Sequence, residues 1–356
     1  MKKQTNFKLH EFSGTWREIG QQYGEALRNE IQDMREYWKF ALSAVMPNTK
    51  LEEIVDASAV FIDPIKAYAP EIMDELEGLA EGAGLPLNEV LFHQGSFEMD
   101  VAGPLYIGGC TSFAAAGKAT KDGKTVAGQH FDWFDGAEMV IIKMKPNDGP
   151  AILGTTIAGQ LVQFGINSLG LAHYANVLCW PKSVVGVPCV AVGQKVLGCK
   201  NVPDGVRSVT QCNNAIALNH VIASKDGSIL DIEATPDKCG VVTPERDMVA
   251  HANNILTPFL MENDLVDQTF FPDSFLRQYR MRQLLDENYG QIDAELMQTL
   301  MADHRGYPDS ICRHVDPDDP DAEKGRTLLS IISVPEDGKI WVSPQPCEYD
   351  YQMFSL

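Results

Sequence analysis

Apolar and polar residues alternate in the first third of the chain with the period of an amphipathic α-helix. Between residues 14 and 45, apolar side chains such as Ile19, Tyr23 and Leu27 recur every three or four positions, with Arg and Glu between them. The same spacing predicts further helices over residues 51–61, from 64 to about 82, and from 86 onward. Because each helix has one apolar face, we expect residues 1–109 to form a helical layer that packs on the rest of the chain.

After residue 109 the pattern becomes that of short strands. Apolar runs are separated by turn sequences such as Asp122-Gly123 and Asp226-Gly227, which favour tight hairpins. Strands are expected over residues 110–116, 124–129, 139–144, 151–155, 160–165, 170–176, 215–224, 228–233, 248–252, 327–335 and 340–343. Helices are expected over residues 188–197, 203–209, 272–287 and 293–303. This order predicts an α+β protein in which two antiparallel sheets lie between helical layers.

The composition is that of an ordinary globular protein, and its excess of acidic residues excludes some classes of binding partner. The chain has 356 residues, of which 44% are hydrophobic and 22% are charged, enough for one large domain or two average ones. Asp and Glu outnumber Lys and Arg by 49 to 29, which gives a formal net charge of −20. Because so acidic a surface repels nucleic acid and anionic membranes, we expect neither as a partner.

The sequence offers no targeting or redox signal that would place the protein outside the cytoplasm. The basic start has no apolar run behind it, and no stretch is long and apolar enough to span a bilayer. None of the eight cysteines belongs to a Cys-x-x-Cys pair, which argues against a zinc knuckle or a thioredoxin-type site. A cytoplasmic location with mostly reduced thiols is therefore expected.

The segment 314–323 is rich in Asp and Pro and is the one stretch that could suggest a calcium loop. It lacks the Asp-x-Asp-x-Asp-Gly order of such loops, so it is interpreted as a solvated surface loop. The sequence therefore predicts neither a metal nor an organic cofactor.

The stretch Gly108-Gly109-Cys110 is the first candidate for chemistry. Two glycines allow the backbone to bend sharply, and a thiol that follows such a bend can be approached by a substrate. Free cysteine is also commonly a small buried hydrophobe, and the tripeptide alone favours that interpretation. A nucleophilic role for Cys110 needs a base or a lowered pKa.

Two bases are available to Cys110 from the sequence. In a papain-like arrangement the base would be His251, followed by Asn253 and Asn254, although the sequence context of papain-type cysteines is missing and Cys110 begins a predicted strand. Alternatively, cleavage of the Gly109–Cys110 bond would free an α-amino group on the nucleophile's own residue. With an unperturbed pKa of about 7.7–8.0, that amine can take the thiol proton near neutrality.

Several short motifs occur in a fixed order along the chain. They are residues 14–20 (Gly-Thr-Trp-Arg-Glu-Ile-Gly), 109–111 (Gly-Cys-Thr), 128–134 (Gly-Gln-His-Phe-Asp-Trp-Phe), 165–171 (Gly-Ile-Asn-Ser-Leu-Gly-Leu), 251–254 (His-Ala-Asn-Asn), 272–274 (Pro-Asp-Ser) with Arg277, Arg280 and Met281, and 307–313 (Tyr-Pro-Asp-Ser-Ile-Cys-Arg). This ordered set resembles the acyl-coenzyme A:6-aminopenicillanic acid acyltransferase family, the C45 group of the N-terminal nucleophile hydrolases.

The resemblance implies an αββα N-terminal nucleophile fold and a precursor that cuts itself. Cleavage before Cys110 would give a helical small chain, residues 1–109, and a catalytic large chain, residues 110–356. The two chains would stay associated, and the resemblance leaves a homo-oligomer open.

The resemblance also implies a role for each matching residue. Cys110 would be the nucleophile for self-cleavage and then for substrate, and Asp132 would orient the new amino group. Asn253 matches the oxyanion-hole Asn of the family, and Arg313 matches an Arg near the nucleophile. Asn176 resembles a second Asn that related choloylglycine hydrolases place near the oxyanion.

Each matching residue has a structural interpretation as well. Asp132 could occupy a turn, and Asn253 could end a strand because Asn tolerates left-handed backbone. Arg313 could pair at the surface with the Asp-rich loop that follows it, and Asn176 could simply pack. His130, where the family shows Asn, is interpreted as a structural histidine because an N-terminal amine makes a histidine base unnecessary.

Together these features predict an enzyme that cleaves a linear amide C–N bond and passes the acyl group through a Cys110 thioester to water or an amine. The substrate would be a small-molecule acyl amide, and acyl-coenzyme A could be a co-substrate. Departures from the family beside the nucleophile, at Ser112, His130 and Phe131, mean that the substrate need not be a penicillin. The alternatives are a papain-like hydrolase that uses Cys110 and His251, and an inactive binding or scaffold protein of the same fold.

Overall fold

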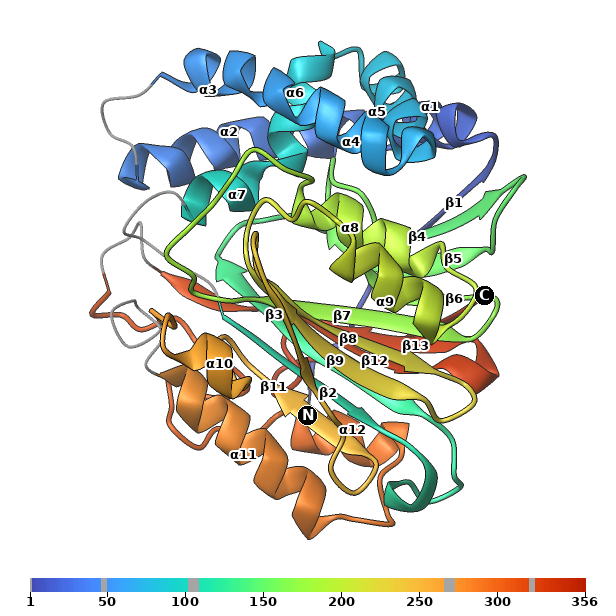
Figure 1. The fold of residues 1–356 in the computed structure, drawn as a ribbon, viewed down its shortest axis with the longest axis vertical. Helices are drawn as coiled ribbons and strands as arrows, with labels where there is room; N and C mark the ends of the chain where they lie inside the picture. Colours follow the sequence, from blue (N-terminus) through green and yellow to red (C-terminus); the bar gives the residue numbers. More distant parts are fainter. Residues whose placement is uncertain (1, 46–49, 102–108, 266–272, 320–323) are drawn as a thin grey trace.

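Two β-sheets lie face to face at the centre of the molecule, with helices on the outer side of each (Figure 1). The structure is a computed structural model that describes residues 2–45, 50–101, 109–265, 273–319 and 324–356. The arrangement is the predicted α+β sandwich of two sheets between helical layers.

Within the described residues, the first sheet has eight strands, and every neighbouring pair is antiparallel except the pair of β1 and β4. In spatial order the strands are β1 (Leu9–Gly14), β4 (Met139–Pro146), β5 (Ile152–Ile157), β6 (Phe164–Asn167), β7 (Leu171–Val177), β8 (Leu218–Ser224), β9 (Ile229–Ala234) and β10 (Cys239–Val242). Because β1 belongs to the N-terminal segment, residues 1–109 contribute a strand to this sheet as well as helices.

The second sheet has six described strands, all paired antiparallel. In spatial order they are β11 (Met248–His251), β2 (Cys110–Ala115), β3 (Val126–Phe134), β12 (Gly325–Val334), β13 (Lys339–Ser343) and β14 (Gln352–Ser355). Every residue of β2 and β3 is buried, because the first sheet covers one face and helices cover the other. Polar side chains on these strands therefore need partners inside the protein.

Helices cover both outer faces. The layer on the eight-stranded sheet holds α1 (Trp16–Ala26), α2 (Arg28–Val45), α3 (Leu51–Ala57), α4 (Ile62–Tyr68), α5 (Pro70–Ala83), α6 (Leu87–Gln94), α7 (Ser96–Val101), α8 (Cys189–Leu197) and α9 (Val202–Thr210). The opposite layer holds α10 (Pro258–Met261), α11 (Asp273–Glu287) and α12 (Ala294–Leu300). Of these, α11 packs on β2 and β11, which brings this layer against the start of β2.

The contact between α1 and α5 depends on glycine. The two helices approach so closely that a Cβ atom added at Gly20 would lie 1.9 Å from the Glu75 carbonyl oxygen. One added at Gly24 would lie 2.4 Å from the backbone nitrogen of Ala83. A capping box between Thr15 and Glu18 fixes the start of α1, so that its glycine face meets α5.

Two of the predicted helices are interrupted. The helix expected over residues 14–45 is α1 and α2, with Leu27 between them in a non-helical conformation. The helix expected from residue 64 is α4 and α5, separated at Ala69, because the residue before Pro70 is sterically kept out of the helical region. The apolar side chains continue through both breaks, so the period alone does not reveal them.

The strands that sequence analysis missed are edge strands. β1, β10 and β14 were not predicted. Each lies at the edge of its sheet and has only one buried residue. The strand predicted over residues 160–165 begins only at Phe164, after a turn at Gly159 with a φ of +88°. Gly108, Pro272 and residues 320–323 of the predicted loop lie outside the described residues.

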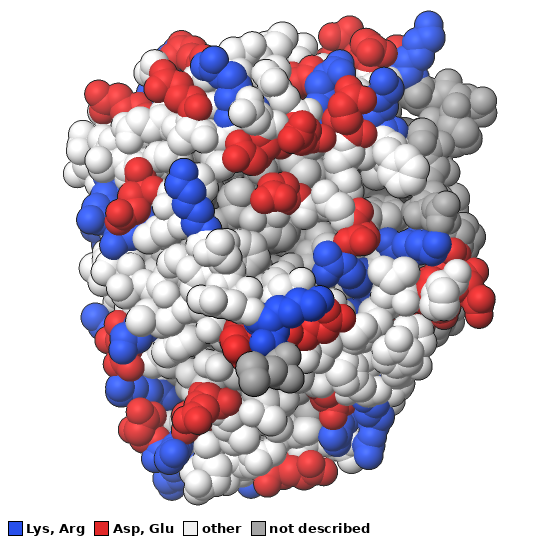
Figure 2. All heavy atoms as spheres, turned by 180° about the vertical axis from the view of Figure 1, so that it is seen from behind, with Lys and Arg blue, Asp and Glu red and all other residues white. Residues whose placement is uncertain are grey.

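One face of the molecule carries charges of both signs. Figure 2 shows the face opposite to that of Figure 1, where acidic and basic side chains are interspersed over a largely uncharged surface. Among the residues that the structure describes, no helix is long and apolar enough to cross a membrane.

Candidate active site

Cys110 is the first residue of β2 and lies beside β3 in the six-stranded sheet. Its side chain is buried, and its strand partner is Phe131. The next residue on β3, Asp132, donates its backbone N–H to the carbonyl oxygen of Gly109, at 2.8 Å. The carbonyl of the Gly109–Cys110 bond is thus fixed next to the thiol by a donor that points at its oxygen.

Side chains hold the backbone of Cys110 on both sides. Its N–H donates to Oδ1 of Asn253 at 3.0 Å, and its carbonyl accepts from Nη1 of Arg277 at 2.7 Å. Asn253 follows β11 and is itself fixed, because its N–H donates to Ser274 Oγ at 2.8 Å and its Nδ2 donates to the Val177 carbonyl at 2.9 Å. The predicted nucleophile and the predicted oxyanion-hole Asn are therefore in direct contact.

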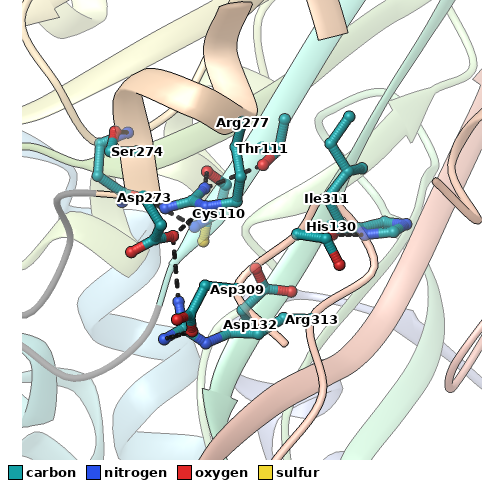
Figure 3. A network of polar contacts seen from close by, with 12 residues as sticks. Cys110, Thr111, His130, Asp132, Asp273, Ser274, Arg277, Asp309, Ile311 and Arg313 are labelled. Atoms are coloured by element: carbon teal, nitrogen blue, oxygen red, sulfur yellow. Dashed lines mark hydrogen bonds and ion pairs between the residues drawn. The ribbon is translucent and has the colours of Figure 1, made fainter. Parts of the chain in front are cut away.

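Arg277 of α11 is the central cation of the site (Figure 3). Only 1% of its surface is exposed, and its guanidinium also donates to Thr111 Oγ1 at 3.0 Å and to Asn253 Oδ1 at 2.9 Å. Its Nε pairs with Asp273, one helical turn earlier. Buried charge is costly unless it is paired and hydrogen-bonded, and here nearly every donor of the guanidinium has an acceptor.

Gly109 lies directly against the guanidinium of Arg277. A Cβ atom at position 109 would lie 2.9 Å from Nη2 of Arg277, closer than real Cβ contacts come. Any other residue there would push the guanidinium away from the Cys110 backbone.

The Asp132 carboxyl is buried close to the thiol. Its Oδ1 accepts from Thr327 Oγ1 at 2.7 Å, whereas Oδ2 has no hydrogen-bond partner among the described residues. Burial raises the pKa of this carboxyl to about 7, although Arg277 and Thr327 act in the opposite direction. The group can therefore gain or lose a proton near neutral pH.

The thiol of Cys110 is held neutral while the Gly109–Cys110 bond is intact. Burial, and secondarily the nearby Asp132 carboxylate, raises its pKa to about 12. A thiol with this pKa is a poor nucleophile at neutral pH, so the site needs a base.

Arg313 extends the charged network beyond Arg277. Its guanidinium pairs with Asp273 at 3.2 Å and with Asp309 at 2.6 Å, and its side chain is 13% exposed. Figure 3 shows it beside Asp132, and its charge contributes to lowering the pKa of that carboxyl. Asp273 thus links the two arginines.

Asn176 approaches the site from the other sheet. It lies on β7, and its Nδ2 donates to Ser112 Oγ at 2.8 Å. Because alternate residues of a strand face the same side, Ser112 and Cys110 share the face of β2 that Asn176 meets. Oδ1 of Asn176 is buried without a hydrogen-bond partner among the described residues. The structure brings this residue next to the site, in contact with Ser112 and not with Cys110.

His251 is turned toward carboxylates. Its Nε2 contacts Glu233 Oε1 at 3.0 Å and its Nδ1 contacts the Ala252 carbonyl at 2.9 Å. Burial alone would lower its pKa, but Asp231 and Glu233 outweigh burial and raise the pKa to about 9. A protonated imidazole whose two nitrogens are both engaged is badly suited to take a proton from Cys110.

His130 occupies a different environment. Its Nδ1 contacts the Ile311 carbonyl at 2.7 Å, and burial lowers its pKa to about 4. The ring therefore ties β3 to the segment that carries Arg313, in agreement with a structural role.

Sequence analysis assigned no role to Arg277, Asp273 or Thr327. The spacing of Asp273 and Arg277 does predict an ion pair, since an acid and a base four residues apart on a helix are expected to interact. Nothing in that spacing indicates that the pair is buried against the nucleophile. Thr327 carries no local signal at all, because its contact with Asp132 joins residues 195 positions apart.

Comparison with known families gives one match. The model of a family described as acyl-coenzyme A:6-aminopenicillanic acid acyl-transferase matches residues 119–345, more than half of the chain. The matched segment includes Asp132, Asn176, Asn253 and Arg313 and begins after Cys110.

Similarity to solved structures is distant. A variant of conjugated bile acid hydrolase from Clostridium perfringens is 14% identical, with 69% of this chain and 97% of that chain covered and a TM-score of 0.46. Penicillin V acylase from Agrobacterium tumefaciens is 12% identical, with 66% and 83% covered and a TM-score of 0.43. The comparison with curated proteins finds no match.

Proposed function

This chain belongs to the acyl-coenzyme A:6-aminopenicillanic acid acyl-transferase family, and we propose that it is a self-processed enzyme that cleaves a linear amide C–N bond through a thioester on Cys110. The observation that carries the proposal is the set of three hydrogen bonds, here called the clamp, that fix the backbone on both sides of the Gly109–Cys110 bond. The Asp132 N–H holds the Gly109 carbonyl, while Asn253 and Arg277 hold the N–H and carbonyl of Cys110.

Self-cleavage uses this clamp directly. Sγ of Cys110 attacks the Gly109 carbonyl carbon, the C–N bond breaks, and the nitrogen takes a proton to become the α-amine of Cys110. The oxygen that becomes negative is the one held at 2.8 Å by the Asp132 N–H, and such a donor contributes about 3–4 kcal/mol in well-studied oxyanion holes. Water then hydrolyses the thioester, which leaves a Gly109 carboxylate and a free thiol.

The carboxyl of Asp132 is the proposed proton acceptor for the first step. Its Oδ2 has no hydrogen-bond partner among the described residues and its pKa is about 7, whereas the thiol keeps its proton with a pKa of about 12. After cleavage the new amine stays near Asn253 Oδ1 and takes over as the base of the thiol. Asp132 then holds the charge of the ammonium group.

Turnover of substrate repeats the same geometry. Departure of the Gly109 carboxylate frees the place of its carbonyl, so a substrate carbonyl that enters there meets the Asp132 N–H. Cys110 forms the acyl thioester, and the leaving amine takes the thiol proton from the α-amine. In the uncut chain Asn253 Nδ2 donates to the Val177 carbonyl. This hydrogen bond must break before Nδ2 can act as a second donor to the oxyanion.

Water or an amine resolves the thioester. We favour hydrolysis, because transfer needs a pocket that excludes water in favour of an amine. In the transferase case acyl-coenzyme A or another acyl donor would load Cys110. The small and large chains stay associated in this account, because β1 is paired with β4 of the large chain.

The wild type and two variants separate the candidate functions. The wild type is expected to give two chains by intact mass and to hydrolyse members of an acyl-amide panel, whereas Cys110→Ala stays uncut and inactive. His251→Gln is expected to be cut normally. Normal cleavage together with complete loss of turnover in His251→Gln would favour the papain-like alternative. A single stable wild-type chain that forms no acyl adduct on Cys110 would favour the scaffold alternative.

A further inference from the structure

Four potential metal ligands converge away from the nucleophile. They come from three segments: His304 after α12, Cys312 and His314 on the loop that bears Arg313, and Cys347 between β13 and β14. Their ligand atoms all lie within 4.8 Å of one another. No step of the proposed reaction uses any of them.

Four of the six separations between the ligand atoms are close to the edges of a zinc tetrahedron. The two histidine Nε2 atoms are 2.9 Å apart, and the two Sγ atoms are 3.4 Å apart. His314 Nε2 lies 3.5 Å from Cys347 Sγ and 3.9 Å from Cys312 Sγ. Zinc bonds of about 2.3 Å to sulfur and about 2.0–2.1 Å to nitrogen give edges of roughly 3.3–3.8 Å in a tetrahedron. To admit the ion, His304 must move away from His314 by about half an ångström and take a place within that range of both sulfur atoms, from which it lies no more than 4.8 Å away.

We propose that His304, Cys312, His314 and Cys347 form a structural Cys2His2 site for Zn²⁺. Thiolate and imidazole are the ligands that zinc selects over magnesium or calcium, which prefer oxygen. Binding deprotonates both thiols and releases two protons, and the resulting Zn(Cys⁻)2(His)2 unit is electrically neutral. Because all four positions are protein ligands, the site is closed and serves the fold instead of activating water.

The surroundings suit such a site. Cys312 is buried, His314 and Cys347 are half-buried, and His304 is exposed, so an ion can enter from the surface past His304. Gln345 Nε2 lies 3.2 Å from both His314 Nδ1 and the Arg313 carbonyl oxygen, so Gln345 holds the His314 ring against its own loop.

The site would anchor the segment that supports Asp132. Arg313 stands between two of the ligands, and its N–H donates to Thr327 Oγ1 at 2.9 Å. The same hydroxyl donates to Asp132 Oδ1. Zinc would therefore tie the Arg313 loop to the segment between β13 and β14, next to the candidate active site.

Zinc content of the untagged, reduced protein tests the proposal. After zinc loading and desalting, mass spectrometry of metals is expected to find about one ion per chain in the wild type. In Cys347→Ser and in His304→Ala, zinc falls about tenfold or more. Cys199→Ser and His10→Ala, which change half-buried residues outside the cluster, are expected to retain it.

Cobalt provides a second readout that does not depend on activity. Co²⁺ in the metal-free wild type is expected to give the sulfur-to-cobalt charge-transfer band and the intense visible bands of a tetrahedral site, and Cys347→Ser should lose them. Circular dichroism shows whether each variant is folded. If Cys347→Ser does not fold, His304→Ala replaces it as the test variant, because His304 is exposed and its substitution should not disturb the fold. Equal zinc in the wild type and both ligand variants would overturn the proposal. So would a Cys312–Cys347 disulfide that persists in place of metal after reduction and zinc loading.

Discussion

The helices on the two outer faces of the molecule meet their neighbours in opposite ways. On one face, α1 meets α5 backbone to backbone through Gly20 and Gly24, and its Arg17 forms exposed ion pairs at the rim. On the other face, α11 meets β2 through the buried guanidinium of Arg277, which reaches the backbone of Cys110. The first contact depends on shape and the second on hydrogen-bonded charge.

This difference distinguishes residues that contribute only to stability from residues that also position the groups of the proposed reaction. Close glycine packing stabilises a helix pair but offers a substrate nothing to bind. A buried arginine is expensive unless its partners are kept in place, and such a group fixes the geometry of whatever it contacts. Changes at the α1–α5 contact should therefore alter stability alone, whereas changes around Arg277 should alter processing as well.

The largest effect is expected from Arg277→Met. It removes a donor from the Cys110 carbonyl and from Asn253 Oδ1, whereas Asp273 keeps its pair with Arg313. Breaking a buried pair costs about 3–5 kcal/mol when the partner is left unpaired, so we expect a loss near the lower end of that range. We expect lower stability in chemical denaturation together with loss of cleavage before Cys110 by intact mass. Arg280→Met, on the same helix and partly exposed, is the matched control and should process normally. Normal processing in Arg277→Met would break the contrast between the two faces.

Asp132→Asn should leave the fold in place and slow the chemistry. Loss of a positioned acid or base typically costs about 10²–10⁴-fold in rate, so both the rate of self-cleavage and kcat of any processed enzyme should fall in that range. The backbone N–H that contacts Gly109 remains in the variant. A variant that processes and turns over substrate at the wild-type rate would contradict the role of the carboxyl.

The same variant should change the dependence of stability on pH. Because the pKa of Asp132 is raised to about 7 in the folded protein, the folded state binds more protons than the unfolded state between its ordinary pKa of 3.8 and about 7. The contribution of this group to stability therefore falls as pH rises through that window and is constant above it. In the uncut background, the unfolding free energy of Cys110→Ala/Asp132→Asn minus that of Cys110→Ala should grow from pH 4 to pH 7, and a constant difference would contradict the raised pKa.

Gly24→Ala tests the other face. The added Cβ would meet the backbone of α5 at 2.4 Å, and overpacking of this kind costs about 1–3 kcal/mol. Thermal unfolding should show the loss, while the extent of cleavage and the activity per processed molecule stay at the wild-type level. Glu25→Ala, exposed on the same helix, should change neither quantity. Loss of processing in Gly24→Ala at a temperature where it is fully folded would show that the two faces are not independent.

The smallest effect is expected from Thr327→Val. The substitution keeps the shape but removes the hydroxyl that donates to Asp132 and accepts from the Arg313 N–H, at a cost of about 1 kcal/mol for each hydrogen bond. Since the hydrogen bond to Asp132 lowers the pKa of that carboxyl, its loss should move the acid limb of the pH–rate profile of self-cleavage, the step in which Asp132 is the proposed base, to higher pH. An unchanged profile would mean that Asp132 does not set it.

The periodic spacing of apolar residues was sufficient to predict the layers of the fold. Helical period before residue 109 and strand period after it predicted the sandwich, because most elements bury one continuous apolar face. β1, β10 and β14 escaped detection because edge strands bury too little to show a period. The break at Leu27 escaped because the apolar pattern runs through it.

The candidate site was predicted through motifs, and its supporting contacts were not. Cys110, Asp132 and Asn253 stand in recognisable order, and the structure brings them together. The burial of Arg277 depends on where α11 packs, which no local pattern shows. No sequence motif joins Cys312 and Cys347, because 35 residues separate them and their thiols approach only in the folded chain.

The most direct test of the account is the first residue of the large chain. Purified wild-type protein is expected to separate under denaturing conditions into two chains, of which the larger begins at Cys110 and forms an acyl adduct on that residue when mixed with a substrate. Cys110→Ala is expected to remain one chain without turnover. A larger chain that begins elsewhere, or substrate turnover that persists in Cys110→Ala, would contradict the central claim.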